Sequence, residues 1–445
     1  MDNRESTRPL DRSVCLGEPQ RRISFSVEDL CRHTIAFGSS GSGKTTRLYN
    51  PLLLEILGKL GAGGLIIAAK AEAVVEAVEI ARRAGREATV IQPGSPVGLD
   101  LLSGSPDVDA MYLRDTFGHL SDEGRRWVDA GVARMKNALR MLHAAGSQYY
   151  NFDALSNYCF DDQFAAIARV QAMEHLRGLP HGSDEAWTIR EAMSYEDTRY
   201  REFTPDTRRA VQFACSQLLE PLRDVHIAKT FARRHNLDSI ETVFDGNVVI
   251  LHVPRSRYER AAQAIYTMAK RRFFTAVENR RANPALDQER PVVFGVDEYQ
   301  LCISETDIQS LGIVRSAGCM VLATAQGVSS LYAALPQLLV DAALQNFTQK
   351  VFFKTDDYDT LALLDRATKH AANHVDPGML FTMNRNQAMC HLTVGDESID
   401  DIVTLPPLFV TPSYFGDSSG NAKAGAPAAP QGAPVVQVRP GINAA

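Results

Sequence analysis

The sequence has few cysteines, no long apolar segment and no excess of basic residues, and each absence excludes a class of protein. Seven cysteines among 445 residues never form a C-x-x-C pair, which excludes a disulfide framework and a cysteine-based zinc site and indicates a reducing compartment. The longest apolar runs, such as residues 63–69 and 318–325, fall far short of the roughly 18 residues that a membrane-spanning helix needs. The polar N-terminus has no apolar signal core. We therefore expect a soluble, cytoplasmic protein.

The chain also lacks a strong excess of either charge. Lys and Arg total 47 against 53 Asp and Glu, for a net charge of −6. This balance excludes a chain-wide basic coat but leaves room for a local basic groove. Hydrophobic residues at 45% and charged residues at 22% are ordinary globular usage and exclude a disordered or fibrous chain. The length allows two or three domains, or one large core with an insertion.

Apolar strands and helices alternate in the first and last parts of the chain. The expected strands are residues 33–37, 64–68, 88–91, 247–252, 292–296, 319–324 and about 350–353. The expected helices are one from Lys44 onward, with a kink or break at Pro51, and residues 72–84, 258–281 and 307–316. Continuous apolar strands that alternate with helices are typical of a mostly parallel sheet covered on both faces, so we predict an α/β fold.

The middle of the chain follows a different pattern. Residues 106–236 contain no β-branched run, and helical periodicity dominates at 124–145, 161–177, 184–195 and 205–222. We therefore predict an all-helical inserted domain that interrupts the sheet. After residue 416 the composition shifts to mostly Gly, Ala, Pro and Ser, which bury too little apolar surface to fold, so we predict a disordered tail.

The turn after the first strand matches the phosphate-loop pattern G-x-x-x-x-G-K-[ST] in full, since residues 38–45 read GSSGSGKT. Glycines let the backbone wrap so tightly that its N–H groups point at phosphate oxygens, and the next helix offers the positive end of its dipole. Lys44 would reach the β- and γ-phosphates, and the Thr45 hydroxyl would bind Mg²⁺. A flexible glycine turn is the alternative. The predicted contacts to ATP are Gly38, Ser39, Ser40, Gly41, Ser42, Gly43, Lys44, Thr45 and Thr46.

Two carboxylates end a later apolar strand, where residues 292–298 read VVFGVDE. Asp297 would join Thr45 in holding Mg²⁺, through water, and Glu298 would polarise the attacking water, because in-line hydrolysis needs a positioned acceptor. A solvated acidic strand end is the alternative. Together with the phosphate loop, the pair predicts a P-loop ATPase in which Lys44 and Glu298 are catalytic.

Two further residues are candidates for catalysis. Gln326 ends the strand at 319–324 and would sense the γ-phosphate if this strand lies beside the strand that ends in Asp297. Arg315 precedes the same strand and would be supplied to the nucleotide of a neighbouring subunit. The alternatives are a polar residue that closes a strand and a surface arginine that ends a helix.

These features predict five parts of the chain. They are a polar N-terminal segment (1–30), the first part of a nucleotide-binding domain (31–104), an all-helical insertion (105–240), the second part of the nucleotide-binding domain (241–411) and a Gly/Ala/Pro-rich tail (412–445).

The order of these motifs resembles a known family. It runs from HTIAFGSSGSGKTT through GLIIAAKAE, a helical insertion and PVVFGVDEYQ to VRSAGCMVLATAQ. This is similar to the type IV secretion coupling proteins, the conjugative ATPases of the TraG/TraD group within the FtsK–HerA superfamily. The resemblance covers residues 30–370. It implies a P-loop NTPase of RecA-like type, a hexameric ring, and nucleic-acid-stimulated ATP hydrolysis that moves DNA or a protein–DNA complex through a secretion channel.

The family's roles match Lys44, Thr45, Asp297, Glu298, Gln326 and, less closely, Arg315. The implied partners are single- or double-stranded DNA, relaxase or secretion-channel proteins, and further copies of the chain. Family members usually carry N-terminal transmembrane helices, so for this chain we expect contact with the inner membrane only through a partner. The family's Asp-Pro-Lys-Gly-Glu turn reads AAKAE here, at residues 68–72, which retains Lys70 and Glu72 but lacks the aspartate.

Other candidate sites have plainer interpretations. The basic run Lys270-Arg271-Arg272, with Arg280-Arg281, would line a nucleic-acid channel or, as we favour, form a solvated helix face. Arginine pairs at 125–126, 208–209 and 233–234 have the same two interpretations, and the aromatic residues at 149, 150 and 152 are either core or base-stacking. His370 and His374 have the spacing of a metal pair but no further ligand nearby.

Two other functions fit the same motifs. One is a nucleotide-switched recruitment adaptor that binds relaxase or effector proteins. The other is a soluble relative of the superfamily that acts in defence or genome processing.

Overall fold

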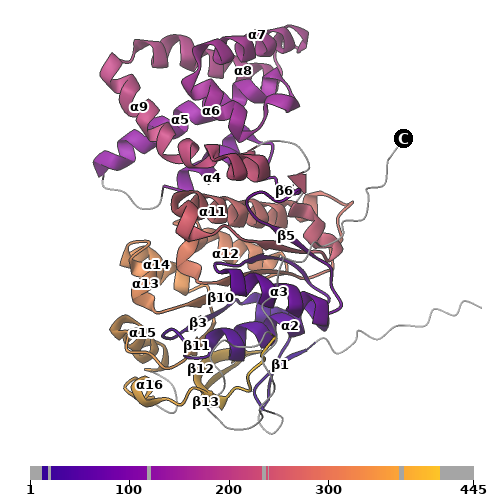
Figure 1. The fold of residues 1–445 in the computed structure, drawn as a ribbon, viewed down its shortest axis with the longest axis vertical. Coiled ribbons are helices and arrows are strands. Elements are labelled where there is room, and N and C mark those ends of the chain that lie inside the picture. The colour runs from indigo at the N-terminus through magenta and orange to yellow at the C-terminus, as the bar shows by residue number, and fades with distance from the viewer. Residues whose placement is uncertain are drawn as a thin grey trace, which may run out of the picture. The chain divides into compact units, whose positions relative to one another are not determined.

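The computed structural model describes residues 13–18, 22–117, 122–232, 237–238, 240–369 and 375–410. These residues include a nine-stranded sheet, which lies below the helices α4–α9 in the view of Figure 1. Its strands, in spatial order, are β13 (Glu397–Thr404), β12 (Gln387–Val394), β11 (Gln349–Phe352), β3 (Thr34–Phe37), β10 (Cys319–Ala325), β9 (Val292–Asp297), β4 (Gly63–Ile67), β8 (Val248–Leu251) and β5 (Ala88–Ile91). All pairs from β11 to β5 are parallel, which confirms the predicted α/β fold with a mostly parallel sheet.

The antiparallel hairpin of β12 and β13 at one edge has no counterpart in the sequence prediction. Its second strand, ESIDDIVT, carries Asp400 and Asp401, which interrupt the apolar alternation that identifies a strand. Two-stranded pairs outside the main sheet join β1 (Val14–Leu16) to β2 (Ile23–Phe25) and β6 (Gly98–Leu99) to β7 (Leu237–Asp238).

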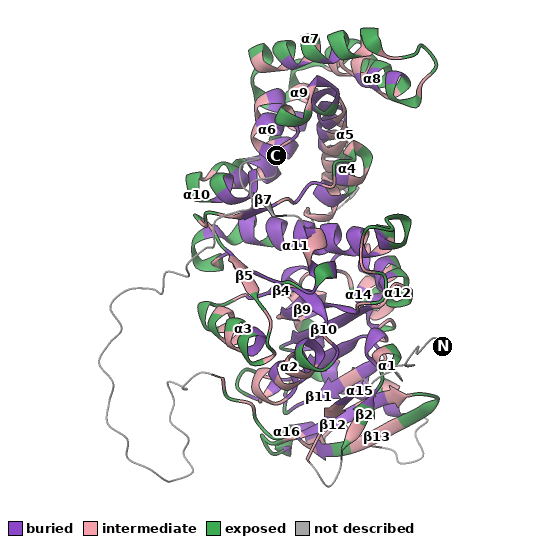
Figure 2. Ribbon diagram, turned by 90° about the vertical axis from the view of Figure 1, so that its right-hand side faces the viewer, coloured by how far each residue is buried: buried purple, intermediate pink, exposed green. Residues whose placement is uncertain are grey.

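Helices cover both faces of the sheet. Successive side chains along each strand point to opposite sides, and because both sets are apolar, each face needs a cover. Val293 of β9 packs in the same apolar cluster as α2 (Asn50–Gly58) and α3 (Ala71–Arg83). Its neighbour Phe294 packs in the cluster of α11 (Arg255–Asn279) and α12 (Asp307–Ser316). In Figure 2 the buried strands lie between these helices. The other helices of the α/β part are α1 (Val27–Cys31), α13 (Val328–Tyr332), α14 (Gln337–Leu344), α15 (Tyr358–Thr368) and α16 (Met379–Thr382).

The helix after the phosphate loop changes its pitch. It begins as a π-helical turn, Thr45–Tyr49, and continues as α2 with Pro51 in its first turn. Proline is tolerated in a first turn because its missing amide hydrogen has no essential partner there. The expected break at Pro51 does not occur, since the chain is helical from Thr45 to Gly58.

The described residues between β6 and β7 form helices joined by short turns, with no strand among them. The elements are α4 (Pro106–Asp115), α5 (Asp122–Ala145), α6 (Phe152–Phe160), α7 (Asp162–Gly178), α8 (Asp184–Ser194), α9 (Pro205–Leu219) and α10 (Val225–Ile227). Side chains cap several of them, as Ser183 does for α8 and Thr204 for α9. Tyr150 and Phe152 are buried and Tyr149 is half-buried, which favours core packing over base stacking.

Some predictions concern residues outside the described ranges, namely the tail at 412–445, His370, His374, Arg233 and Arg234. Within the described ranges, no helix combines the length and the apolar character that crossing a membrane requires.

Candidate nucleotide-binding site

Segments that lie far apart in the sequence meet at the carboxyl ends of the central parallel strands. The phosphate loop follows β3, Asp297 ends β9, and β10 lies between these two strands. In the register, Ala325 of β10 lies opposite Phe37 and Thr324 lies opposite Asp297. The expected neighbourhood of the two strands at 292–296 and 319–324 is therefore confirmed. Ligand sites of open parallel sheets lie at this edge.

The phosphate loop needs glycine at both of its ends. A Cβ on Gly38 would lie 2.7 Å from both the Cβ of Phe353 and the Oγ of Ser42, so no larger residue fits. Gly43 has φ of +106°, which residues with a side chain rarely adopt. The Ser39 amide donates to the carbonyl of Lys354 at 3.0 Å, which ties the loop to the segment after β11.

Polar groups inside the loop fit an anionic ligand. Lys44 is buried, and its ammonium donates to the carbonyl oxygens of Gly38 and Ser39. Burial lowers the pKa of Lys44, while the carboxylates of Asp297 and Glu298 act against this shift. The Ser42 hydroxyl is buried and has no hydrogen-bond partner among the described residues. Phosphate oxygens would satisfy both the ammonium and this hydroxyl.

Two hydroxyl groups fix the carboxylate of Asp297. The Thr45 Oγ1 donates to its Oδ2 at 3.2 Å, and the Thr324 Oγ1 donates to its Oδ1 at 2.5 Å. A hydroxyl and a carboxylate oxygen are ligands that Mg²⁺ accepts, commonly with several waters retained. The residues predicted for the metal are thus in direct contact, so this site fits Mg²⁺. Sequence reasoning missed Thr324, because only the register of β10 against β9 brings it to Asp297.

Glu298 adopts a backbone conformation that is uncommon for its residue type. Its φ and ψ are +96° and +70°, in the left-handed region, which costs about 1–3 kcal/mol for a residue with a side chain. The carboxylate accepts from the Lys70 ammonium at 2.9 Å and from the Gln300 amide at 3.1 Å. The bond to Glu298 raises the pKa of Lys70. The retained lysine of the AAKAE turn was the sequence signal for this partner, although its role could not be assigned.

Gln326 and Arg315 lie at opposite ends of β10. Gln326 directly follows the strand at the edge that carries the phosphate loop, and its side chain is exposed. Arg315 is exposed in the last turn of α12, before the strand begins. The seven residues of β10 separate the two ends by roughly 20 Å. The fold therefore does not bring Arg315 to the phosphate loop of its own chain.

A cavity of about 530 Å³ lies beside the phosphate loop. One wall is Ser39–Ser42, and the others are Lys354–Asp356 and Phe381–Arg385. The last of these walls, around α16, was not among the predicted site residues, because its sequence contains no recognisable nucleotide-binding motif. Its position makes it the candidate site for the rest of a nucleotide whose phosphates occupy the loop.

The basic run Lys270-Arg271-Arg272 on α11 is neither a solvated face nor a channel lining, so both interpretations were wrong for these three residues, whereas Arg281, beyond the end of the helix, is exposed. Lys270, Arg271 and Arg272 are all buried. They form ion pairs with Asp307, Asp115 and Glu241, respectively. The sequence alone predicts exposure for this run because its acidic partners lie far away in the chain.

The sequence matches no family model and no curated protein. Several solved structures are similar in fold, including two of the coupling protein TrwB and one of VirB4. The unbound bacterial conjugative coupling protein TrwBdeltaN70 shares 15% identity at a TM-score of 0.64, over 91% of this chain and 90% of that chain. The plasmid coupling protein TrwB in complex with ADP and Mg²⁺ shares 16% at 0.61, over 91% and 90%. VirB4 of Thermoanaerobacter pseudethanolicus shares 15% at 0.53, over 88% and 96%. The chain thus has the P-loop ATPase fold of the coupling protein TrwB and of VirB4, with a helical part joined to a mostly parallel sheet.

Proposed function

We propose that this chain is an ATP-hydrolysing motor of the coupling-protein type that moves DNA, or a protein–DNA complex, toward or through a type IV secretion or conjugation channel. The observation that carries the proposal is the contact between Thr45 and Asp297 beside a complete phosphate loop, with Glu298 next in the chain. The fold shared with TrwB, of which one structure holds ADP and Mg²⁺, supports the choice of ligand. TrwB is described as a conjugative coupling protein, which supports the choice of process.

Each residue of the site has a distinct part in the proposed hydrolysis. The loop amides and Lys44 bind the phosphates and offset their charge. Thr45 and Asp297 would hold Mg²⁺, which supplies further positive charge to the phosphate oxygens. Glu298 orients the attacking water and accepts its proton. Gln326 lies at the same edge of the sheet and would respond to the loss of the γ-phosphate.

We further propose that Arg315 acts on the nucleotide of a neighbouring copy. It is exposed and is remote from the loop of its own chain, so only another subunit could bring an Arg315 to that loop. A guanidinium beside the γ-phosphate stabilises the charge that develops during phosphoryl transfer. This arrangement requires an oligomer, and the proposed form is a hexameric ring with the helical part facing the cargo.

The experiment is ATPase activity across a panel of single- and double-stranded DNA, combined with a mass measurement of the assembly. If the chain is a motor, DNA should stimulate its ATP turnover. Glu298→Gln should abolish turnover and retain nucleotide binding. Full turnover by Glu298→Gln would contradict the catalytic assignment. An ATPase that DNA does not stimulate, but that binds relaxase or effector proteins tightly, would instead indicate the recruitment adaptor.

A further inference from the structure

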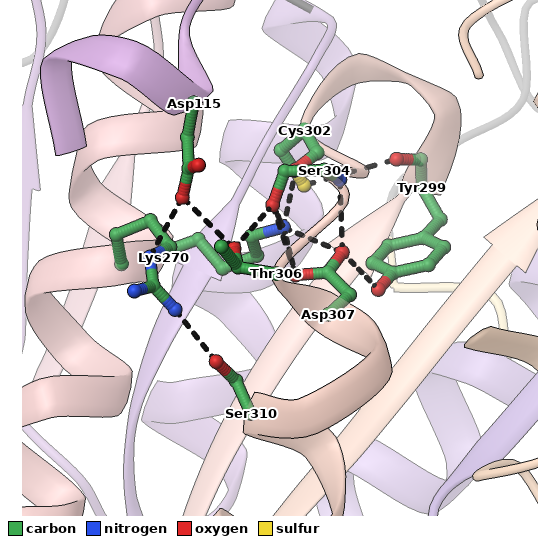
Figure 3. Close-up of polar contacts among 9 residues, drawn as sticks. Asp115, Lys270, Tyr299, Cys302, Ser304, Thr306, Asp307 and Ser310 are labelled. Carbon is green, nitrogen blue, oxygen red and sulfur yellow. Dashed lines mark hydrogen bonds and ion pairs between the residues drawn. The ribbon is translucent and has the colours of Figure 1, made fainter. Parts of the chain in front are cut away.

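A buried polar cluster surrounds the hydroxyl of Tyr299, the residue that follows the Glu298 proposed to orient the attacking water (Figure 3). At its centre, the Lys270 ammonium contacts Asp307 Oδ1 and Oδ2 at 2.5 and 2.6 Å, and both side chains are fully buried. Lys270 also donates to the carbonyl of Cys302, at 2.5 Å, and to the hydroxyl of Ser304. Every charged group of this pair is thus hydrogen-bonded, as burial requires.

Tyr299 connects this cluster to the proposed active site. It directly follows Glu298, it is fully buried, and its hydroxyl donates to Asp307 Oδ2 at 2.6 Å. Its ring packs edge-on against Phe347, with 5.6 Å between centroids. On the other side, the Glu298 amide donates to the Thr324 carbonyl at 3.2 Å. Glu298 is therefore held on one side by the hydrogen bond from its own amide to β10, and on the other side by the buried side chain of Tyr299.

The cluster also reaches the helical part of the chain. Asp115, at the end of α4, forms an ion pair with Arg271 at 2.9 Å and accepts a hydrogen bond from the Thr306 hydroxyl at 2.8 Å. Arg271 follows Lys270 on α11, and Thr306 precedes Asp307 at the start of α12. In Figure 3 these side chains form one continuous set of contacts from Asp115 to Tyr299.

We propose that Tyr299 and Asp307 are positioning residues for hydrolysis. They hold Glu298 in its left-handed conformation, so that its carboxylate points at the attacking water. Through Asp115 they also make this orientation depend on how α4 packs. Neither residue touches the phosphate loop, so they act on turnover and not on nucleotide binding. The inference rests on the proposed ATPase function.

The test is Tyr299→Phe, which removes one hydroxyl and keeps the buried ring. We expect kcat to fall at least tenfold, while KM and the affinity for a fluorescent ATP analogue change less than twofold. The matched control is Tyr332→Phe, because the Tyr332 hydroxyl also donates to a carboxylate, Asp341, at 2.9 Å, and neither residue lies on α4 or in the cluster. The control should keep its kcat.

A double-mutant cycle separates positioning from a general structural effect. If Tyr299 acts through Glu298, adding Tyr299→Phe to Glu298→Gln should change the residual rate less than twofold. An unchanged kcat in Tyr299→Phe would overturn the inference, and so would equal losses of kcat in the two tyrosine variants or a loss of nucleotide affinity in proportion to kcat. Full turnover by Glu298→Gln alone would overturn the proposed function itself, so the two failures are distinguishable.

Discussion

The ammonium of Lys70 lies 2.9 Å from Oε1 of Glu298, which joins the turn after β4 to the end of β9. The lysine side chain is 61% exposed and the glutamate side chain 17%, so the ion pair sits at the mouth of the site. Its position makes it a restraint on the carboxylate and not a source of stability, because exposed ion pairs contribute little to folding.

Lys70→Ala should therefore affect turnover selectively. We expect kcat to fall roughly tenfold, because Glu298 loses the partner that holds its carboxylate in place, with little change in the affinity for ATP. The control is Lys59→Ala, which breaks another exposed lysine pair, with Glu55, at the end of α2. Steady-state kinetics of both variants checks this prediction, and equal kcat values for the two would contradict it.

Lys44→Ala should abolish productive nucleotide binding. The variant loses the charged hydrogen-bond donor at the centre of the loop, so the affinity for Mg·ATP should fall by about 10- to 100-fold and turnover should become undetectable. Isothermal titration calorimetry gives the affinity. Unchanged binding would show that the loop does not hold the phosphates.

Thr324→Val should weaken the binding of Mg²⁺. The substitution keeps the shape of the side chain but removes the hydroxyl that holds Asp297 Oδ1 at 2.5 Å. Groups that orient a metal ligand typically affect metal affinity by about tenfold or more, so half-maximal activity should require about tenfold more Mg²⁺. Binding of ATP without Mg²⁺ is the internal control and should not change. An unaltered Mg²⁺ dependence would argue against Asp297 as the metal-binding carboxylate.

Arg315→Ala should show complementation between subunits. The variant should bind nucleotide normally and lose hydrolysis, because its phosphate loop is intact but its neighbours lack the guanidinium. Mixing it with Lys44→Ala should restore part of the activity, since some sites then combine an intact loop with an intact Arg315. The ATPase rate against mixing ratio is the measurement, and a mixture with no more activity than its components would rule out action in trans.

His33 should make folding sensitive to acid. It is fully buried, its Nε2 donates to the Leu311 carbonyl at 2.9 Å, and its Nδ1 accepts from the Val321 amide at 3.2 Å, so only the neutral ring satisfies both. Burial lowers its pKa to about 4. The unfolded chain, with a histidine pKa of about 6.5, then binds the proton first, so stability present above pH 6.5 is lost toward pH 4, by about 3 kcal/mol.

Urea unfolding at a series of pH values tests this in the wild type and in His33→Asn. The variant will be less stable throughout, so the comparison concerns the slope and not the level. The wild type should lose more stability between pH 6.5 and 4 than the variant does. Parallel curves would show that another group carries the acid sensitivity.

The central strands were predictable because a parallel sheet buried on both faces leaves continuous apolar runs in the sequence. The edge hairpin was not, since Asp400 and Asp401 sit on a strand with one exposed side. The phosphate loop and the acidic turn were also readable, because their residue types and spacing are local properties of the chain.

What escaped the sequence depends on the pairing of distant segments. Thr324 reaches Asp297 only through the register of β10 on β9, and Lys70 reaches Glu298 only because β4 lies beside β9. The predicted exposure of the basic run on α11 was wrong for the same reason, since its charges are balanced by Asp115, Glu241 and Asp307 and not by neighbours in the sequence. The local sequence shows which residues are charged, but the fold determines whether each charged group contacts water or another side chain.

The strand order has a consequence for synthesis of the chain on the ribosome. β3, which carries the phosphate loop, hydrogen-bonds to β10 and β11, and both are translated more than 280 residues after it. The nascent chain therefore exposes β3 with both edges unpaired while the whole helical part is being made. At about 5–20 residues per second, that interval lasts at least ten seconds or so. Nascent molecules of this length should accordingly be clients of ribosome-associated chaperones until β10 and β11 have emerged.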